Sequence, residues 1–190
     1  MAVFAQAGAY LVSTFGGLII FALAMRFFIH FSRVSWSNPV VDSLNQCVDP
    51  WIKRAQRLVS TRFEFALLLI MVAIQLVKLT VLYVLGVGGV PSVVALVAMA
   101  LVDSARLLAN ICFYALLAEA VLSWIPGMQQ SALYGVLSVV TTPILSPIRR
   151  HIPCQLNGID FAPLLAIIGL QLLDIIVFNP LMGYVFAFMS

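Results

Sequence analysis

Long apolar runs alternate with short polar segments along this chain. The first run begins at Ala9 and ends where Arg26 follows Met25. A second lies between Glu64 and the glycine-rich turn that starts at Gly86. About 20 apolar residues in a helix cross the hydrocarbon core of a bilayer. The pattern therefore predicts transmembrane helices at about 8–31 and 64–86.

The next apolar stretch is too long for one perpendicular span. From Pro91 to Trp124 it would measure about 50 Å as a helix, against a core of about 30 Å. We place the third span at about 103–124 and predict a short re-entrant, interfacial or outward-projecting helix at 91–102. The fourth span is expected at about 160–180, with Asn179-Pro180 as a break and the apolar tail as a possible outward continuation.

Composition places the chain among membrane proteins. It is 63% hydrophobic and 9% charged, with a mean hydropathy of +1.11, whereas soluble domains carry about 25% charged residues. We predict an all-α integral membrane protein with four transmembrane helices. No charged residue precedes Arg26, so the first run lacks the basic start of a cleavable signal and is expected to remain as a span.

Basic residues concentrate in two of the three connections between these spans. The first connection contains Arg33, Lys53, Arg54, Arg57 and Arg62. The third contains Arg149 and Arg150. The second, between Gly86 and Val102, has no Lys or Arg. By the positive-inside rule both basic connections face the cytoplasm. This predicts a multi-pass protein of the bacterial inner membrane with both termini in the periplasm.

The chain also shows an internal duplication. A shift of 93 residues places Arg26 on Glu119, and a shift of 96 places Lys78 on Asp174. The other matches are Pro50 with Pro143, Arg57 with Arg150, Glu64 with Asp160 and Gln75 with Gln171. We predict two parallel repeats, 1–90 and 91–190, each a span, a cytoplasmic amphipathic hook and a span, related by a pseudo-two-fold axis along the membrane normal.

The first hook is expected to consist of two helical segments, with a new one starting at Asp49-Pro50. In the second segment, apolar positions 51, 52, 55, 58 and 59 share a face, and the basic residues lie off it. This favours contact with the headgroups of anionic lipids, although a solvated loop that only sets topology is an alternative. The residues assigned to this lipid-facing basic hook are Trp51, Lys53, Arg54 and Arg57.

The second hook holds three prolines, Pro143, Pro147 and Pro153. Proline fixes φ and removes an amide donor, so a single smooth helix is not expected here. Arg149-Arg150 could bind a phosphate or an acidic partner segment, or could serve only to set topology.

Polar residues inside spans are costly and usually have partners. Those in the predicted spans are Arg26, Gln75, Lys78, Asp103, Arg106, Glu119, Gln171 and Asp174. We expect Lys78 to meet Asp174 across an interface of the second and fourth spans, with Asp103 as a second acid. Gln75 and Gln171 would complete the hydrogen bonding. The cluster could join the repeats, form a polar path for an ion or proton, or dock a membrane protein.

Motifs for catalysis are not found. His30 and His151 belong to different hooks, and the three cysteines form no CxxC pair. We expect no enzymatic activity, no cofactor, no metal and no direct binding of nucleic acid.

The order of Ser123-Trp124, Thr142-Pro143, Pro147-Ile148-Arg149-Arg150, Ile152-Pro153 and Gly158-Ile159-Asp160-Phe161-Ala162-Pro163 resembles the YggT family of small integral membrane proteins. The resemblance is dense over about 117–171 and looser over 26–78. The motif residues of the second hook are Pro143, Pro147, Arg149, Arg150, Pro153, Gly158, Asp160 and Pro163.

The resemblance implies two kinds of function. Chloroplast relatives are linked to assembly of a membrane cytochrome complex and to nucleoid distribution, and bacterial relatives often lie beside division genes, which implies a scaffold or assembly factor with a membrane-protein partner. The alternative is a role in osmotic stress or ion homeostasis, as an oligomeric channel, since four spans leave little room for a pore in one subunit.

Overall fold

The computed structural model describes residues 2–31, 39–59, 63–87, 92–152, 155–156 and 159–187. Its α-helices are α1 (Ala2–Phe31), α2 (Pro39–Val59), α3 (Phe63–Val87), α4 (Val93–Ser123), α5 (Ala132–His151), α6 (Ala162–Leu173) and α7 (Asn179–Ala187). A 3-10 turn, η1 (Met128–Gln130), precedes α5, and a π-helical turn, η2 (Asp174–Phe178), joins α6 to α7. A two-residue antiparallel ladder pairs β1 (Gln155–Leu156) with β2 (Ile159–Asp160).

The protein is built from α-helices that have the length and apolar character of membrane spans, as predicted. Within the described residues, five helical segments are long and apolar enough to cross a membrane: Phe4–Phe31, Phe65–Gly86, Val93–Ser123, Ala132–His151 and Ala162–Val185. Four of them correspond to the predicted spans. The fifth is α5, which the sequence assigned to the second hook.

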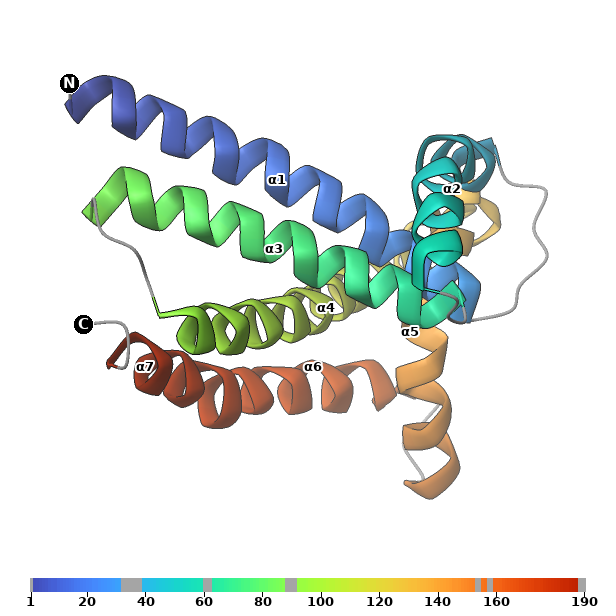
Figure 1. Cartoon of the computed structure of the whole chain (residues 1–190). Helices are drawn as coiled ribbons and strands as arrows, with labels where there is room; N and C mark the ends of the chain where they lie inside the picture. The colour runs from blue at the N-terminus through green and yellow to red at the C-terminus, as the bar shows by residue number, and fades with distance from the viewer. Residues whose placement is uncertain are drawn as a thin grey trace.

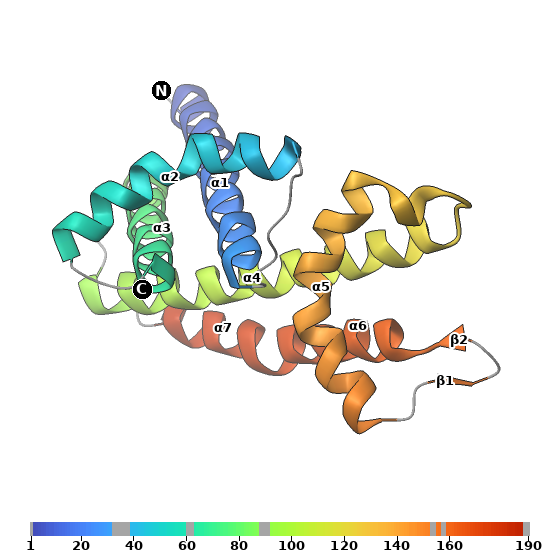
Figure 2. The same cartoon turned by 90° about the vertical axis from the view of Figure 1, so that its right-hand side faces the viewer.

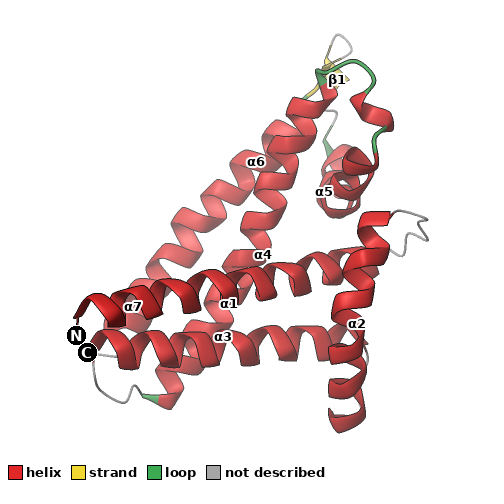
Figure 3. Cartoon of the chain, turned by 90° about the horizontal axis from the view of Figure 1, so that it is seen from above, coloured by secondary structure: helices red, strands yellow, loops and turns green. Residues whose placement is uncertain are grey.

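The long helices form two pairs that are inclined to each other, and the other two helices cross their ends. Helices α1 and α3 run alongside each other, as do α4 and the continuous rod of α6, η2 and α7 (the α6–α7 rod), with α2 and α5 at the same end of both pairs (Figures 1 and 3). Helix α2 crosses the ends of α1 and α3, and α5 crosses α4 and α6 (Figure 2). The start of α1 and the end of α7 lie at the opposite end (Figure 1).

Two helix pairs make up the bundle. Helix α1 packs on α3, α4 packs on α6 and α7, and α3 packs on α4 to join the pairs. Seen from above, the two pairs diverge from this contact (Figure 3). The expected interface between the second and fourth spans is wrong, because α3 packs on α4 rather than on α6.

The main core lies where α1 and α3 meet α2 near the crossing helices. It includes Ile20, Leu67 and Met71, together with Ile52 of α2, all 0% exposed. A smaller core joins α4, α5 and α6 through Leu116, Leu145, Ala162 and Ala166. Large apolar side chains cover the outside of the bundle; Phe4 is 84% exposed and Val94 is 80% exposed. Such a surface suits lipid rather than water.

Helices continue through three places where an interruption was predicted or left open. The new segment expected at Asp49-Pro50 is wrong, whereas at 91–102 and after Asn179-Pro180 the outward continuation is the alternative found. Helix α4 is a single helix of 31 residues from Val93, so most of 91–102 extends the third span. Helix α2 contains Pro50 within its length. The fourth span continues past Asn179-Pro180, with Pro180 in the first turn of α7, where an amide donor is not needed.

Helix α5 also includes two of the three prolines of its hook. Pro143 and Pro147 lie inside it, and it ends at His151. In the turn before Pro143 the hydroxyl of Thr142 donates to the carbonyl of Ser138. Proline cannot donate to the carbonyl four residues before it, and the packing of α5 on α1, α4 and α6 supports the helix across these two positions. The third proline, Pro153, lies outside the described residues.

Candidate functional site

Residues of the second-hook motif meet where α4, α5 and α6 converge. Three of them, Arg149, Asp160 and Pro163, line an open pocket of about 580 Å³ where these helices meet. Its lining includes Glu119, Trp124, Tyr134, Arg149, Asp160 and Pro163. Residues from three helices that are distant in sequence thus form one surface.

Arg149 and Asp160 join α5 to the start of α6. The Arg149 Nε donates to Asp160 Oδ2 at 2.9 Å, and its second terminal nitrogen (Nη2) lies 2.7 Å from the same oxygen. Asp160 Oδ1 accepts from the backbone amide of Ala162 at 2.9 Å, which supplies an acceptor in the first turn of α6. Asp160 therefore holds both the helix start and the arginine in place.

Glu119 lies on the other wall of this pocket. It accepts a short hydrogen bond from the hydroxyl of Thr141, which is 0% exposed. Burial, followed by the negative charge of Glu119 and a hydrogen bond to it, raises the pKa of Tyr134. Thr141 was missed from the sequence, although its spacing of four from both Leu137 and Leu145 marks the inward face of α5.

The first hook has a corresponding contact between a long helix and its crossing helix, but it is an ion pair rather than a hydrogen bond from a hydroxyl. Arg26, at the position equivalent to Glu119, donates from Nε to Asp49 of α2 at 2.8 Å, and its side chain is only 11% exposed. Its guanidinium also lies 5.0 Å from the centre of the Phe63 ring, a distance typical of cation–π contacts. In both halves a charged residue near the end of a long helix binds the crossing helix that follows it.

The polar residues of the bundle interior form two links at the other end of α4. Gln75 Nε2 donates to Asp103 Oδ2 at 2.6 Å and joins α3 to α4. Arg106 donates to Asp174 Oδ1 from Nε at 2.8 Å and to Oδ2 from Nη2 at 3.0 Å, and also to Asn179 Oδ1 at 2.9 Å. The π turn between Asp174 and Asn179 brings these two side chains to the same guanidinium.

The expected pair of Lys78 with Asp174 is therefore wrong. Asp174 binds Arg106 instead, because α6 packs on α4 and not on α3. Gln75 is buried at 2% exposure, but Gln171 is exposed, so these two equivalent glutamines do not complete a common network. The stem of Lys78 lies against α1 at Gly16.

The basic face of the first hook divides in two. Trp51, Lys53 and Arg54 are exposed, whereas Ile52, which was expected to share the lipid-facing stripe, is buried in the core. The side chain of Arg57 lies outside the described residues, as do Pro153 and Gly158. In the second hook Arg150 is exposed beside Arg149. Of the described residues, no group of three or more His, Cys, Asp or Glu could hold a metal ion.

Relatives of known sequence cover most of the chain. An uncharacterized protein of Pseudomonas aeruginosa is 26% identical over 178 residues, which span 92% of this chain and 90% of that protein. The uncharacterized protein YggT of Escherichia coli K12 is 26% identical over 167 residues, 87% of this chain and 86% of its own length. An uncharacterized protein encoded 3′ of proC in Vibrio alginolyticus is 26% identical over 166 residues, 86% of this chain and 89% of that protein. No solved structure matches.

A family model described as CCB3/YggT matches residues 98–181, which contain the whole pocket of the second hook. The matched segment includes both walls of that pocket and the Arg106–Asp174 link. The family match over the second half of the chain and the relatives over most of its length together support a protein of the YggT family.

Proposed function

We propose that this protein is a non-enzymatic scaffold or assembly factor of the bacterial inner membrane. It crosses the membrane four times, through α1, α3, α4 and the α6–α7 rod. Helices α2 and α5 lie on the cytoplasmic surface, and both termini are periplasmic. Each half is then one repeat: a span, a crossing helix and a span.

Two features support a surface position for α5. It crosses the ends of the long helices in the same way as α2, which is not among the candidate spans (Figures 1 and 2). Its last turn carries Arg149, Arg150 and His151, and clustered basic residues favour the cytoplasmic headgroup region. Trp51 and Trp124, 67% and 84% exposed, lie near the same end and suit an aromatic belt.

The pocket of the second hook is the docking site in this proposal. Its open mouth presents Trp124 and Arg149, with Arg150 exposed beside them. An aromatic ring next to arginine is a common basis for strong protein contacts. The partner is an acidic segment of another membrane protein, whose carboxylates would meet Arg149 and Arg150 while its apolar side chains meet Trp124. The convergence of motif residues on this one pocket carries the proposal.

Complementation and co-purification test it together. In a strain that lacks the gene, replacing Arg149, Arg150, Asp160 and Pro163 should abolish function and partner recovery at matched expression. Replacing Lys53, Arg54, Glu64 and Leu67 of the first repeat, with Leu67 changed only to Met so that the core keeps its volume, should leave most of both. Equal loss from the two sets of replacements would refute a docking site in the second hook.

A role in ion homeostasis is the second candidate, as an oligomeric channel. It is favoured by the groove that contains Gln75, Lys78, Asp103, Arg106 and Asn110, since polar groups within spans often mark ion paths. Ion flux through liposomes that contain the purified protein, lost on Asp103→Leu, would favour this candidate. Flux no faster than through protein-free liposomes would favour the scaffold.

A further inference from the structure

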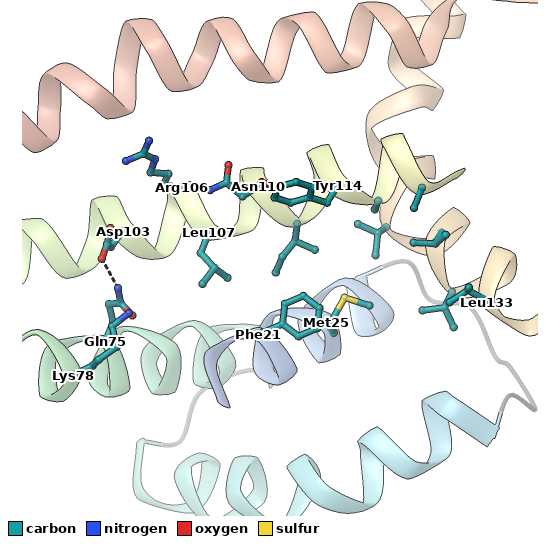
Figure 4. A pocket seen from close by; sticks show the side chains of 16 residues that line it. Phe21, Met25, Gln75, Lys78, Asp103, Arg106, Leu107, Asn110, Tyr114 and Leu133 are labelled. Atoms are coloured by element: carbon teal, nitrogen blue, oxygen red, sulfur yellow. Dashed lines mark hydrogen bonds between the residues drawn. The ribbon is translucent and has the colours of Figure 1, made fainter. Parts of the chain in front are cut away.

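A long groove opens between the two helix pairs. It has a volume of about 830 Å³ and is lined by α1, α3, α4 and α5. One end is polar, with Gln75, Lys78 and Asp103, and the other is apolar, with Phe21, Met25 and Leu133 (Figure 4). An open groove with separate polar and apolar ends fits an amphiphile that has one headgroup and one chain in contact with the protein.

The polar end has hydrogen-bonding groups that lack partners. Gln75 donates to Asp103, but Oε1 of the same amide is buried and, within the described part of the chain, accepts no hydrogen bond. Among those residues, Lys78 has no carboxylate within salt-bridge distance, because Asp174 is bound to Arg106. A buried acceptor without a donor and a cation without an anion are both unfavourable in a membrane.

The missing groups are of opposite kinds. Lys78 calls for an anion, and Gln75 Oε1 calls for a donor. Among the described residues, the carboxylate of Asp103 accepts only from the neutral Gln75 amide, so it calls for a positive charge. A phosphate linked to a primary ammonium supplies both. An anionic glycerol headgroup brings no cation to Asp103, and a quaternary amine has no N–H to donate.

The apolar end has the length of one lipid chain. From Leu107 to Ala118 the lining side of α4 extends about 17 Å at 1.5 Å per residue. Half of the hydrocarbon core measures about 15 Å. Lys78 lies about 22 Å along α3 from Phe63, toward the end that is opposite the crossing helices, and its stem allows the ammonium to reach the interface.

We propose that this groove binds one molecule of phosphatidylethanolamine from the leaflet opposite α2 and α5. Its phosphate binds Lys78, and its ammonium binds Asp103 and Gln75 Oε1. One acyl chain lies along Phe21, Met25 and Leu107 toward Leu133. The lipid fills the space where the two helix pairs diverge, so it acts as a structural ligand of the bundle.

Thermal unfolding of delipidated protein in detergent tests this proposal. Phosphatidylethanolamine, phosphatidylcholine and phosphatidylglycerol with identical acyl chains are added in turn. The first should raise Tm by about 3–6 °C at roughly ten times its Kd, with a smaller shift from the other two. Native mass spectrometry should show one retained phosphatidylethanolamine per chain.

Two variants locate the site. Lys78→Gln should remove the preference for phosphatidylethanolamine, and Lys53→Gln, an equal loss of charge on the exposed face of α2, should retain it. Equal Tm shifts from all three lipids in the wild-type protein would overturn the proposal even if Lys78→Gln did not fold. A preference for phosphatidylglycerol, or an undiminished preference for phosphatidylethanolamine in Lys78→Gln, would also overturn it.

Discussion

Arg106 and Asp174 form a two-pronged ion pair between α4 and the π turn that follows α6. The guanidinium donates from Nε to one carboxylate oxygen at 2.8 Å and from Nη2 to the other at 3.0 Å. Both side chains are mostly shielded, at 31% and 22% exposure. This pair, with Asn179 as a further acceptor, fixes the outer half of the second helix pair.

Removal of one partner should leave an unpaired charge within the span. Arg106→Met and Asp174→Leu should each lower the free energy of unfolding by about 1.5–3 kcal/mol. The double variant should lose less than the sum, because neither charge remains. Thermal unfolding in detergent measures this coupling. Additive losses would show that the two side chains do not interact.

Arg26 and Asp49 should hold α2 against the bundle. Asp49→Asn removes the charge that Arg26 binds, so hydrogen exchange of the α2 amides should accelerate about tenfold. Asp42→Asn is the matched control, since Asp42 is exposed on the same helix. Similar exchange of α2 in the two variants would contradict a role for the ion pair in docking this helix.

Adjacent glycines of α1 should respond differently to the same substitution. A Cβ at Gly16 would lie 3.1 Å from Lys78 Cδ, whereas one at Gly17 meets nothing within 4 Å. Gly16→Leu should cost about 1–3 kcal/mol, because the larger side chain must displace the lysine stem. Gly17→Leu should change stability by at most about 0.5 kcal/mol. Equal Tm values for the two variants would place the Lys78 stem elsewhere.

The membrane orientation has a simple test. A reporter that is active only in the cytoplasm, fused after Ser190, should be silent, and the same reporter inserted after Gln130, between α4 and α5, should be active. The four-span arrangement predicts this contrast, because α5 would lie on the cytoplasmic surface. If α5 instead crossed the membrane, the C-terminal fusion would be active.

The sequence was sufficient for the helical class and for the location of the four long apolar helices, because apolar runs reflect the bilayer directly, although α4 begins at Val93, well before the expected start at about 103. It failed at Pro50, Pro143 and Pro147, where helices continue. Proline removes one donor, and tertiary packing can offset that loss. The expectation that proline interrupts a helix considers the proline alone and not the contacts of the helix with its neighbours.

The pairing of charges was harder to predict than their positions. Equivalence of Lys78 and Asp174 suggested a contact, but the choice of partner depends on which helices pack together. Helix α4 lies beside both α3 and α6, so its Asp103 and Arg106 meet Gln75 and Asp174. Neither this order of helices nor the π turn at Asp174 has a signal in the local sequence.

The central claim is that the pocket of the second hook docks a membrane-protein partner. Site-specific photocrosslinking in living cells tests it directly, with a photoreactive phenylalanine in place of Trp124. The matched control replaces Tyr10, an exposed aromatic residue on α1 far from the crossing helices. We expect a discrete adduct from position 124 that is lost when Arg149→Glu is added, and none of that mass from position 10. An adduct of the same mass from both positions, or one unaffected by Arg149→Glu, would contradict the account.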